Sequence, residues 1–226
     1  KADGMITVCQ ALKDTMIEMG VADERVTVLR NGVDLELFRP VDRAAARSAL
    51  GLSRRTLASV GLLIDRKGHH HIIRALKDLP DNDLLIAGDG PDRRALERLV
   101  VEEGVADRVR FLGSVDQNRL REIYNAVDAL VLASSREGWA NVLLESMACG
   151  TPVVASAVWG TPEVVARPEA GVLMPSLDPQ GVAEGVRRLF AAYPDREATR
   201  RYAEGFNWNA TTEGQLKLFR GILARR

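Results

Sequence analysis

The sequence has little of several features that mark particular classes of protein. Its two cysteines, Cys9 and Cys149, show no CxxC or metal-ligand spacing, so two buried, reduced thiols are expected rather than a disulfide framework. Aromatic residues make up 5% of the chain, and its 31 basic and 31 acidic residues cancel, which argues against a nucleic-acid partner. No apolar run approaches the roughly 20 residues of a membrane-spanning helix, and no signal peptide is visible. A soluble, cytoplasmic protein is therefore expected.

What the chain does have is a regular alternation of short apolar runs and amphipathic segments. With 226 residues, 46% of them hydrophobic, it is long enough for one large domain, or for one domain with a piece of another. The predicted strands are 57–61, 83–88, 109–112, 128–133 and 152–155, and the predicted helices between them are 69–77, 92–103, 118–125 and one that ends near 149.

This βα alternation predicts an α/β fold, a doubly wound parallel sheet. Because parallel strands end at the same edge of a sheet, the turns that follow them should share one cleft. These turns come after Gly61, Gly88, Leu112 and Ala133.

The two ends of the chain differ from this middle. The elements predicted there are a strand at 4–9, a helix at 11–19, a strand at 26–29, and helices at 196–204 and 208–223. A βαβ piece of this size cannot cover both faces of its own sheet, so it is interpreted as the remnant of a preceding domain. The expected units are the remnant with its linker at 1–38, the main domain at 39–205, and a C-terminal helix within 206–226.

Two glutamates stand out because of their position around one helix start. Glu137 lies in the turn between a predicted strand and the next helix, where Gly138 permits an unusual backbone. The first amides of that helix, near Ala140 and Asn141, point outward with the positive end of the helix dipole and favour phosphate. Glu145 lies among apolar residues, where an unpaired carboxylate is costly, so it should have donor partners. The alternative is purely structural: Glu137 complements the helix start and Glu145 pairs with a nearby arginine.

A set of motifs, in order along the chain, carries a resemblance to a known family. They are 31–34 (NGVD) with Phe38 and Pro40, 66–68 (RKG), 88–91 (GDGP), 111–113 (FLG), 137–145, 147–154 (MACGTPVV) and 162–165 (PEVV). Together they resemble the C-terminal, donor-binding half of retaining GT-B glycosyltransferases (glycosyltransferase family 4, glycosyl transferases group 1). The match covers nearly the whole chain and is specific in combination, whereas one piece alone is weak. It implies a Rossmann-like sheet, one half of a GT-B fold, with a residual N-terminal βαβ piece and C-terminal helices.

The resemblance also implies roles for individual residues. Lys67 would neutralise the departing diphosphate, and Glu137, its catalytic companion, would orient the hydroxyls of the transferred sugar. Glu145 would hold the donor ribose hydroxyls. The other positions implied at the donor are Gly138, Trp139, Ala140 and Asn141, whose backbone amides face sugar and phosphates; Arg66; Gly61, Gly88 and Gly90, which allow close approach; and Gly113 and Val115, where backbone groups meet the base.

One position departs from the family pattern. The family usually has an arginine directly after the glycine that matches Gly61, as a second cation on the diphosphate, and here that residue is Leu62. Arg66 is near in sequence but occupies another place in the turn, and compensates only if its side chain swings into the cleft. We interpret Leu62 as a subfamily trait.

Several other residues invite a function but have simpler interpretations. Consecutive side chains on a helix point about 100° apart, so His69–His71 should not converge on a metal. Glu163 follows a proline at a predicted helix start and is expected to complement a helix dipole rather than bind ligand. Asp89 is expected to shape its glycine turn. Trp139 either covers the sugar or packs beneath it, and Trp159 has no assignment.

The predicted activity is transfer of a sugar from a nucleotide-diphosphate sugar to an acceptor hydroxyl, with retention through a front-face mechanism. The chain alone is expected to lack most of the acceptor domain and to be inactive without it, and a non-catalytic binding module and a GT-B nucleotide-sugar epimerase are the alternatives. No cofactor or metal is expected. The expected acceptor is a glycan, lipid or small molecule. Peripheral membrane association through the missing N-terminal domain, and a homodimer through apolar surface of the N-terminal piece, are further expectations.

Overall fold

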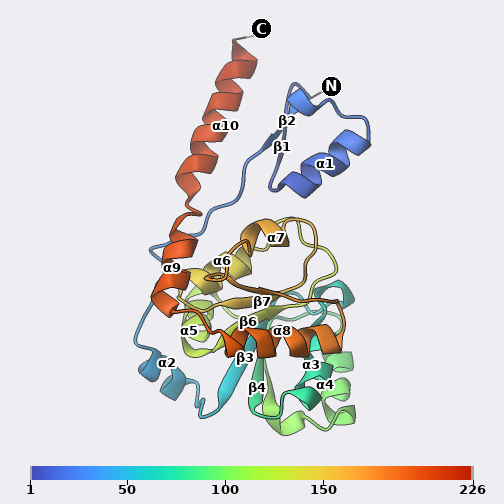
Figure 1. Ribbon diagram of the computed structural model, residues 1–226, viewed down its shortest axis with the longest axis vertical. Coiled ribbons are helices and arrows are strands. Elements are labelled where there is room, and N and C mark those ends of the chain that lie inside the picture. The colour runs from blue at the N-terminus through green and yellow to red at the C-terminus, as the bar shows by residue number, and fades with distance from the viewer. Residues whose placement is uncertain (1, 225–226) are drawn as a thin grey trace.

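The computed structural model describes residues 2–224 and contains a six-stranded parallel sheet with helices on both faces (Figure 1). Its strands are β3 (Arg55–Val60), β4 (Asn82–Ala87), β5 (Val109–Gly113), β6 (Ala129–Leu132), β7 (Val153–Ala155) and β8 (Gly171–Leu173). They lie in the order β5-β4-β3-β6-β7-β8, and every pairing between them is parallel. The chain starts at β3 and adds β4 and β5 on one side. It then returns to add β6, β7 and β8 on the other side, so the direction of winding reverses between β3 and β6. The predicted doubly wound sheet is confirmed.

Two groups of helices cover the faces of this sheet. One group is α3 (His69–Ala75), α4 (Arg93–Glu102) and α8 (Pro179–Ala191), and the other is α2 (Arg43–Ala49), α5 (Gln117–Ala126), α6 (Asn141–Ala148) and α9 (Arg196–Glu204). Strand residues alternate between the two cores: Leu84 and Ile86 pack with the first group and Leu85 with the second. The continuous apolar runs in the sequence are therefore strands buried on both faces. Short 3₁₀ turns, η2 (Asp65–Lys67), η3 (Leu76–Asp78) and η4 (Ala106–Arg108), connect the elements.

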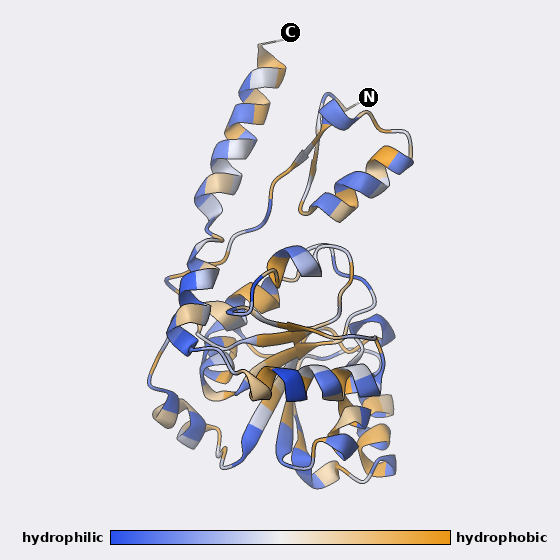
Figure 2. Cartoon of the chain, viewed as in Figure 1, coloured by the Kyte–Doolittle hydropathy of each residue, from blue (hydrophilic) through white to orange (hydrophobic). Residues whose placement is uncertain are grey.

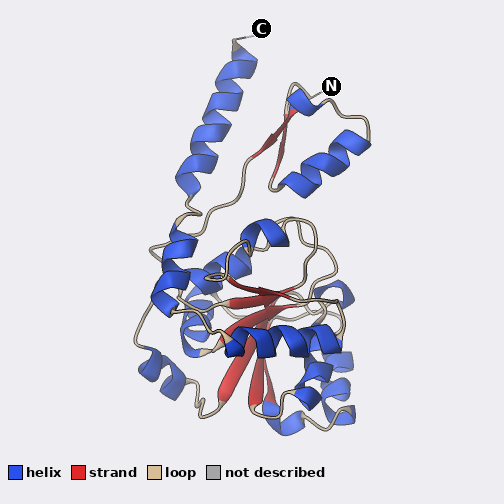
Figure 3. Cartoon of the chain, viewed as in Figure 1, coloured by secondary structure: helices blue, strands red, loops and turns tan. Residues whose placement is uncertain are grey.

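The N-terminal residues form a separate two-stranded parallel sheet, β1 (Met5–Thr7) with β2 (Val26–Val28), linked by α1 (Gln10–Glu18) and η1 (Asp23–Arg25). The C-terminal helix α10 (Trp208–Leu223) runs beside this piece, away from the main sheet (Figure 3). A Cβ added to Gly214 would lie 2.4 Å from Leu29 Cδ2, which shows how closely α10 and the end of β2 approach. The predicted βαβ piece is thus present. Apolar residues on α1 and α10 are visible outside the main domain, and Met19, Phe219 and Leu223 are exposed (Figure 2).

The sequence patterns did not predict α2, β8 and α8. An aspartate cap marks the start of both helices: Asp42 accepts from the Ala44 amide at 2.9 Å, and Asp178 accepts from the Gly181 amide at 2.7 Å. β8 is a three-residue strand at the edge of the sheet that begins with Gly171, so it lacks a readable apolar run. The helices α9 and α10 have the predicted bounds.

Both cysteines are free and buried, as predicted. Burial raises the pKa of the Cys149 thiol to about 12, so it remains protonated at neutral pH. Within residues 2–224, no helix combines the length and apolar character that crossing a membrane demands.

Candidate functional site

The loops that follow β3, β4, β5 and β6 meet at the carboxyl-terminal edge of the sheet, as predicted. The Gly88 amide donates to the Gly113 carbonyl at 2.8 Å, and a Cβ added to Gly88 would lie only 1.9 Å from the Gly61 carbonyl oxygen. On the other side of β3, the Ser135 amide donates to the Arg66 carbonyl at 2.8 Å. Glycine at position 88, with φ at 144°, is therefore what allows neighbouring loops to approach so closely.

A cavity of about 230 Å³ lies at the ends of β3, β4 and β5. Its lining includes Gly61, Leu62, Gly88, Asp89 and Val115. The Asp89 carboxylate accepts from the Gly90 amide at 2.8 Å and so shapes its own turn. Gly90 packs beside the cavity, where a Cβ would lie 2.5 Å from the Leu63 carbonyl oxygen. Gly61 and Gly88, implied at the donor, and Val115 of the implied base-binding turn thus line one hollow, whereas Gly90 and Gly113 are not in its lining.

An ion pair joins the loops after β3 and β6. Lys67, at the end of η2, pairs with Glu137, and Ser134 donates a hydrogen bond to the same carboxylate at 2.9 Å. Gly68, directly after Lys67, has φ at 69°. A Cβ at this position would lie 1.9 Å from the Ala133 carbonyl oxygen, so only glycine lets these loops meet. The Lys67 and Glu137 side chains are 18% and 10% exposed. They sit where the winding of the sheet reverses, which is where open α/β sheets bind ligands.

Glu145 lies on α6 and accepts a hydrogen bond from the Tyr124 hydroxyl at 3.0 Å. Burial raises the pKa of the Glu145 carboxyl, and the Tyr124 bond opposes that rise. Burial also raises the pKa of Tyr124, so its hydroxyl keeps the proton that it donates. The expectation of a donor partner is confirmed. The structural alternative, a nearby arginine, is wrong: across residues 2–224, Glu145 has no ion pair.

The start of α6 presents backbone donors. Ala140 is the N-cap and supplies no side-chain bond to the helix amides, while the Asn141 side chain is exposed. Trp139 turns inward: its ring is 8% exposed, lies 6.1 Å from the Phe206 ring, and its indole N–H donates to the Asn31 carbonyl at 3.1 Å. Trp139 therefore packs beneath the loop rather than covering it.

Glu163 links the main domain to the N-terminal piece. Its carboxylate accepts from the Gln10 amide at 2.7 Å and from Arg30 Nε at 3.1 Å. It lies in the first turn of its own helix, α7 (Thr161–Val164), and its carboxylate also caps the start of α1. Nearby, a Cβ added to Gly138 would lie 3.0 Å from Leu12 Cδ1 of α1. The loop that carries Glu137 is thus in contact with the N-terminal piece.

The second cation of the family pattern has no substitute in contact with the Lys67–Glu137 pair. Leu62 is 54% exposed at the cavity. Arg66 is exposed, and no carboxylate of the described residues lies within 4.0 Å of its guanidinium. Its charge is available, but its side chain does not contact the pair.

Three contacts near this edge were not foreseen from the sequence, and they involve His69, Ser134 and Tyr124. The buried His69 ring contacts Ser59 Oγ at 2.8 Å and the Leu62 carbonyl at 3.3 Å, which ties the β3 loop to the strand. Burial lowers the pKa of His69 to about 4, so the ring is neutral. Its only sequence signal was its place directly after a glycine turn. No group of three potential metal ligands occurs in the part of the chain that the structure covers.

Comparison with known proteins identifies relatives. The family model described as Glycosyl transferases group 1 matches residues 42–206. The chain is 35% identical to the D-inositol 3-phosphate glycosyltransferase of Mycobacteroides abscessus, over 99% of this chain and 53% of that protein. It spans about half the length of the curated relatives that it matches.

Solved structures share the fold. Sucrose-phosphate synthase from Thermosynechococcus elongatus has a TM-score of 0.90 and 31% identity, over 100% of this chain and 60% of that one. HepE from Anabaena, solved in complex with UDP-glucose, has a TM-score of 0.86 and 23% identity, over 97% of this chain and 64% of that one, a likeness of fold alone. The family model covers most of the described chain, and the fold agrees with it. The chain therefore belongs to the glycosyl transferases group 1 family.

Proposed function

We propose that this chain is the donor-binding half of a retaining glycosyltransferase, which transfers a sugar from a nucleotide-diphosphate sugar to an acceptor hydroxyl. The observation that carries the proposal is the Lys67–Glu137 ion pair at the switch point of the sheet. The names of the relatives support it: one is a glycosyltransferase, and a neighbour in fold was solved with UDP-glucose.

The pair supplies charge and position. A bound diphosphate competes with Glu137 for Lys67, because it carries more negative charge than one carboxylate. Lys67 then stabilises the charge that grows on the diphosphate as it leaves. Glu137, still held by Ser134, accepts from hydroxyls of the transferred sugar and fixes its orientation.

The remaining donor contacts follow from the surrounding elements. The uncapped amides at the start of α6 face phosphate, and the Glu145 oxygen that Tyr124 does not occupy accepts from ribose hydroxyls. The base enters the cavity beside Val115. Retention is proposed because the resemblance to retaining GT-B glycosyltransferases implies it. A front-face mechanism is proposed because the site pairs one carboxylate with one ammonium, rather than holding the two close carboxylates of a double-displacement glycosidase. The bond between the anomeric carbon and the diphosphate oxygen breaks, and the acceptor oxygen bonds to that carbon from the same face. The proton of the acceptor hydroxyl passes to an oxygen of the departing phosphate.

The chain by itself is proposed to bind donor without transferring the sugar efficiently. Its match spans only about half of the relatives, and its βαβ piece is separate from the main sheet. A metal-independent, cytoplasmic enzyme remains our expectation. Efficient sugar transfer by this chain alone would contradict the proposal that it only binds the donor. Interconversion of donor sugars without an acceptor would favour an epimerase.

The test is calorimetric binding of a panel of nucleoside diphosphates and their sugars. One base class should bind, and Glu145→Ala should weaken its nucleotide about tenfold or more, because the ribose loses its acceptor. Glu145→Gln, which still accepts from Tyr124, separates loss of charge from loss of packing. Glu97→Gln, on the surface of α4, is the control and should bind like the natural chain. Failure of every nucleotide to bind the complete protein would refute the proposal.

A further inference from the structure

The chain passes twice between the N-terminal piece and the main domain (Figure 1). The first crossing, 29–33, follows β2, and the second, 205–207, joins α9 to α10. The Val33 amide donates to the Phe206 carbonyl at 2.8 Å, and a Cβ added to Gly32 would lie 2.5 Å from main-chain atoms of the second crossing. The two crossings are therefore fixed to each other.

The indole of Trp139 contacts both crossings. Its N–H donates to the Asn31 carbonyl at 3.1 Å, and its ring centroid lies 6.1 Å from that of Phe206. The Arg30 guanidinium carbon is 6.0 Å from the indole centroid, within range of a cation–π contact. A buried tryptophan usually finds a partner for its N–H, and the partner here lies 108 positions away, in the first crossing.

The main chain on both sides of Trp139 belongs to the proposed donor site. Glu137 lies two residues before it, and α6, with its uncapped amides, begins two residues after it at Asn141. Asn31 Nδ2 also donates to Asn141 Oδ1 at 3.3 Å, so the first crossing holds this segment at two points. At the other end of the segment, the Gly160 amide donates to the Glu137 carbonyl at 3.2 Å. The direction of the α6 amides therefore depends on where the crossings lie.

We propose that Trp139 is a positioning residue for the donor diphosphate and acts through the two crossings. Its bond to Asn31 holds the first amides of α6 in the direction in which they meet phosphate, while the buried indole does not itself bind the donor. Amides that are held in place beforehand bind phosphate more tightly, because less conformational freedom is lost on binding. This role rests on the proposed function, since it concerns the same donor site. It is also reciprocal: a diphosphate that holds these amides holds the crossings as well.

The first test is Trp139→Phe in the complete protein, which keeps a buried ring and removes the N–H. The probes are UDP and uridine, or the matching pair for whichever base binds in the donor panel. Calorimetry should show UDP bound about fivefold more weakly and uridine changed less than about 1.5-fold, because only the diphosphate reaches α6. Tyr193→Phe is the matched control. It removes another aromatic donor to a main-chain carbonyl, at the opposite edge of the sheet, and should leave both affinities unchanged.

A second variant tests the other point of attachment. Asn31→Ala removes the side-chain contact to Asn141 and leaves the indole bond in place. It should weaken UDP about twofold and leave uridine unchanged, because an exposed hydrogen bond contributes less than a buried one.

Hydrogen exchange of the Val33 amide tests the reciprocal effect, because this amide bonds one crossing to the other. Saturating UDP should slow its exchange at least about threefold in the natural protein, and saturating uridine should not. In Trp139→Phe saturated with UDP, this protection should be lost, whereas Tyr193→Phe should retain it.

Three results would overturn the role of Trp139. They are equal weakening of UDP and uridine in Trp139→Phe, which would mean that the indole only packs; full affinity for UDP in that variant; and no protection of the Val33 amide by UDP in the natural protein. If the natural protein binds no nucleotide of the donor panel, the proposed function fails as well. If it binds UDP and the variant binds UDP equally, only the positioning role fails, so the two failures are distinguishable.

Discussion

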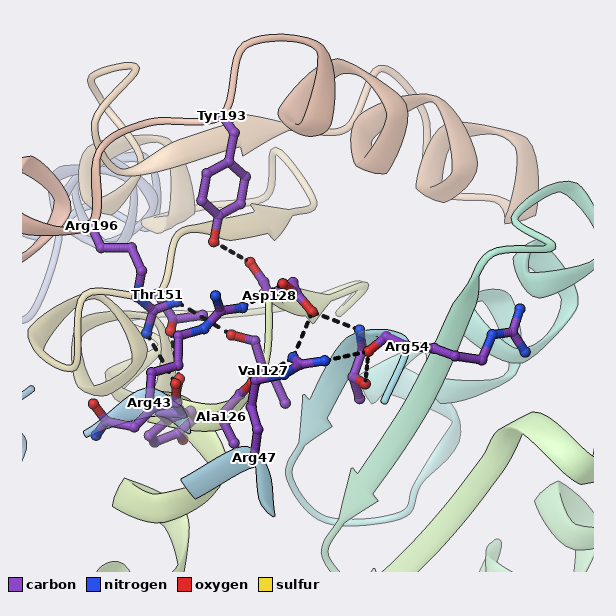
Figure 4. A network of polar contacts seen from close by, with 12 residues as sticks. Arg43, Arg47, Arg54, Ala126, Val127, Asp128, Thr151, Tyr193 and Arg196 are labelled. Carbon is purple, nitrogen blue, oxygen red and sulfur yellow. Dashed lines mark hydrogen bonds and ion pairs between the residues drawn. The ribbon is translucent and has the colours of Figure 1, made fainter. Parts of the chain in front are cut away.

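Charged side chains at the two edges of the six-stranded sheet differ in how fully they are bonded within the protein. At the amino-terminal edge, the Asp128 carboxylate directly before β6 is surrounded by donors (Figure 4): Arg43 Nη2 at 2.6 Å, Arg47 Nη1 at 3.2 Å and the Thr56 amide at 2.8 Å. Its own carbonyl accepts from the Tyr193 hydroxyl at 2.7 Å. Arg43 Nε is buried without a hydrogen-bond partner among the described residues, but each of these side chains is already bonded to the protein through another atom. The network therefore fixes where the strands begin.

At the carboxyl-terminal edge, the same residue types are only partly matched. Glu137 is held by one cation and one hydroxyl. Arg66 and Arg136 are in no ion pair with any residue between 2 and 224. The difference distinguishes charges that stabilise the fold from charges that remain available to a ligand.

The number of arginines at an edge does not by itself distinguish charges that stabilise the fold from charges that remain available to a ligand. A cavity of about 280 Å³ at the amino-terminal edge includes Arg43, Arg196, Arg200 and Arg201 in its lining. Yet Arg196 donates to the Val127 and Cys149 carbonyls, both at 3.3 Å, and Arg200 donates to the Ala148 carbonyl at 2.7 Å. These carbonyls lie at the C-terminal ends of α5 and α6, where cations complement the helix dipole. The bonding of each arginine, rather than the count, separates the two edges.

The largest expected effect is on the amino-terminal network. Asp128→Ala removes the acceptor that two guanidinium groups and a strand amide share, and should lower the free energy of unfolding by about 3 kcal/mol. For a domain of this size, that corresponds to a fall in melting temperature of about 6–12 °C. Glu122→Ala, which breaks a surface pair with Arg119, should cost less than about 0.5 kcal/mol. Loss of nucleotide affinity without loss of stability in Asp128→Ala would remove the contrast between the edges.

The neutral His69 makes the stability of the carboxyl-terminal edge depend on pH. Its pKa in the folded protein is about 4, below the ordinary 6.5, because burial disfavours the charged ring. Between these values the unfolded chain binds a proton that the folded chain does not, so stability falls as pH drops from 6.5 to 4, by up to about 3 kcal/mol. Urea unfolding across this range should show a shallower slope in His69→Gln. His70→Gln, at a more exposed ring, should keep most of the slope, and equal slopes in the natural chain and His69→Gln would contradict the assignment.

Lys67→Ala should impair binding far more than folding. Without the ammonium, Glu137 faces the diphosphate unpaired, and affinity for UDP, if uracil is the base, should fall about 30-fold while uridine changes less than about twofold. Lys77→Ala, which breaks a pair with Glu103 elsewhere, is the matched control. Equal losses for nucleotide and nucleoside, measured by calorimetry, would argue against a role for Lys67 on the diphosphate.

The smallest effect expected is a gain. Leu62→Arg adds a cation to an exposed position that lines the donor cavity, so UDP should bind about threefold more tightly at low ionic strength. The gain should disappear in high salt, because exposed charges are screened. Leu62→Gln controls for loss of the apolar side chain. No gain at low salt would place residue 62 outside the reach of the phosphates.

The sequence predicted local order well and long-range partners poorly. The run at 128–133 was recognisable as a strand because it is buried on both faces, and Glu137 was correctly placed in the turn after it. The Tyr124–Glu145 and Lys67–Glu137 contacts join residues 21 and 70 positions apart, and nothing in a periodic pattern specifies such pairs. Gly68 is a partial exception, since a glycine directly after Lys67 is compatible with a close loop approach. The inward turn of Trp139 depends on the Asn31 carbonyl and could not be read from its neighbours.

The contacts of Gly160 have a consequence for mutational tolerance. A Cβ at this position would lie 2.0 Å from the Gly138 carbonyl oxygen and 2.8 Å from Cys9 Cβ, so any side chain must displace the Glu137 loop or the start of α1. The preceding position is exposed and limited only by its left-handed backbone, which glycine and asparagine adopt most readily. These two adjacent positions therefore differ sharply in their tolerance of substitution. A side chain at 160 alters the geometry around Glu137, whereas a substitution at 159 changes the surface beside Glu137 and leaves that geometry intact.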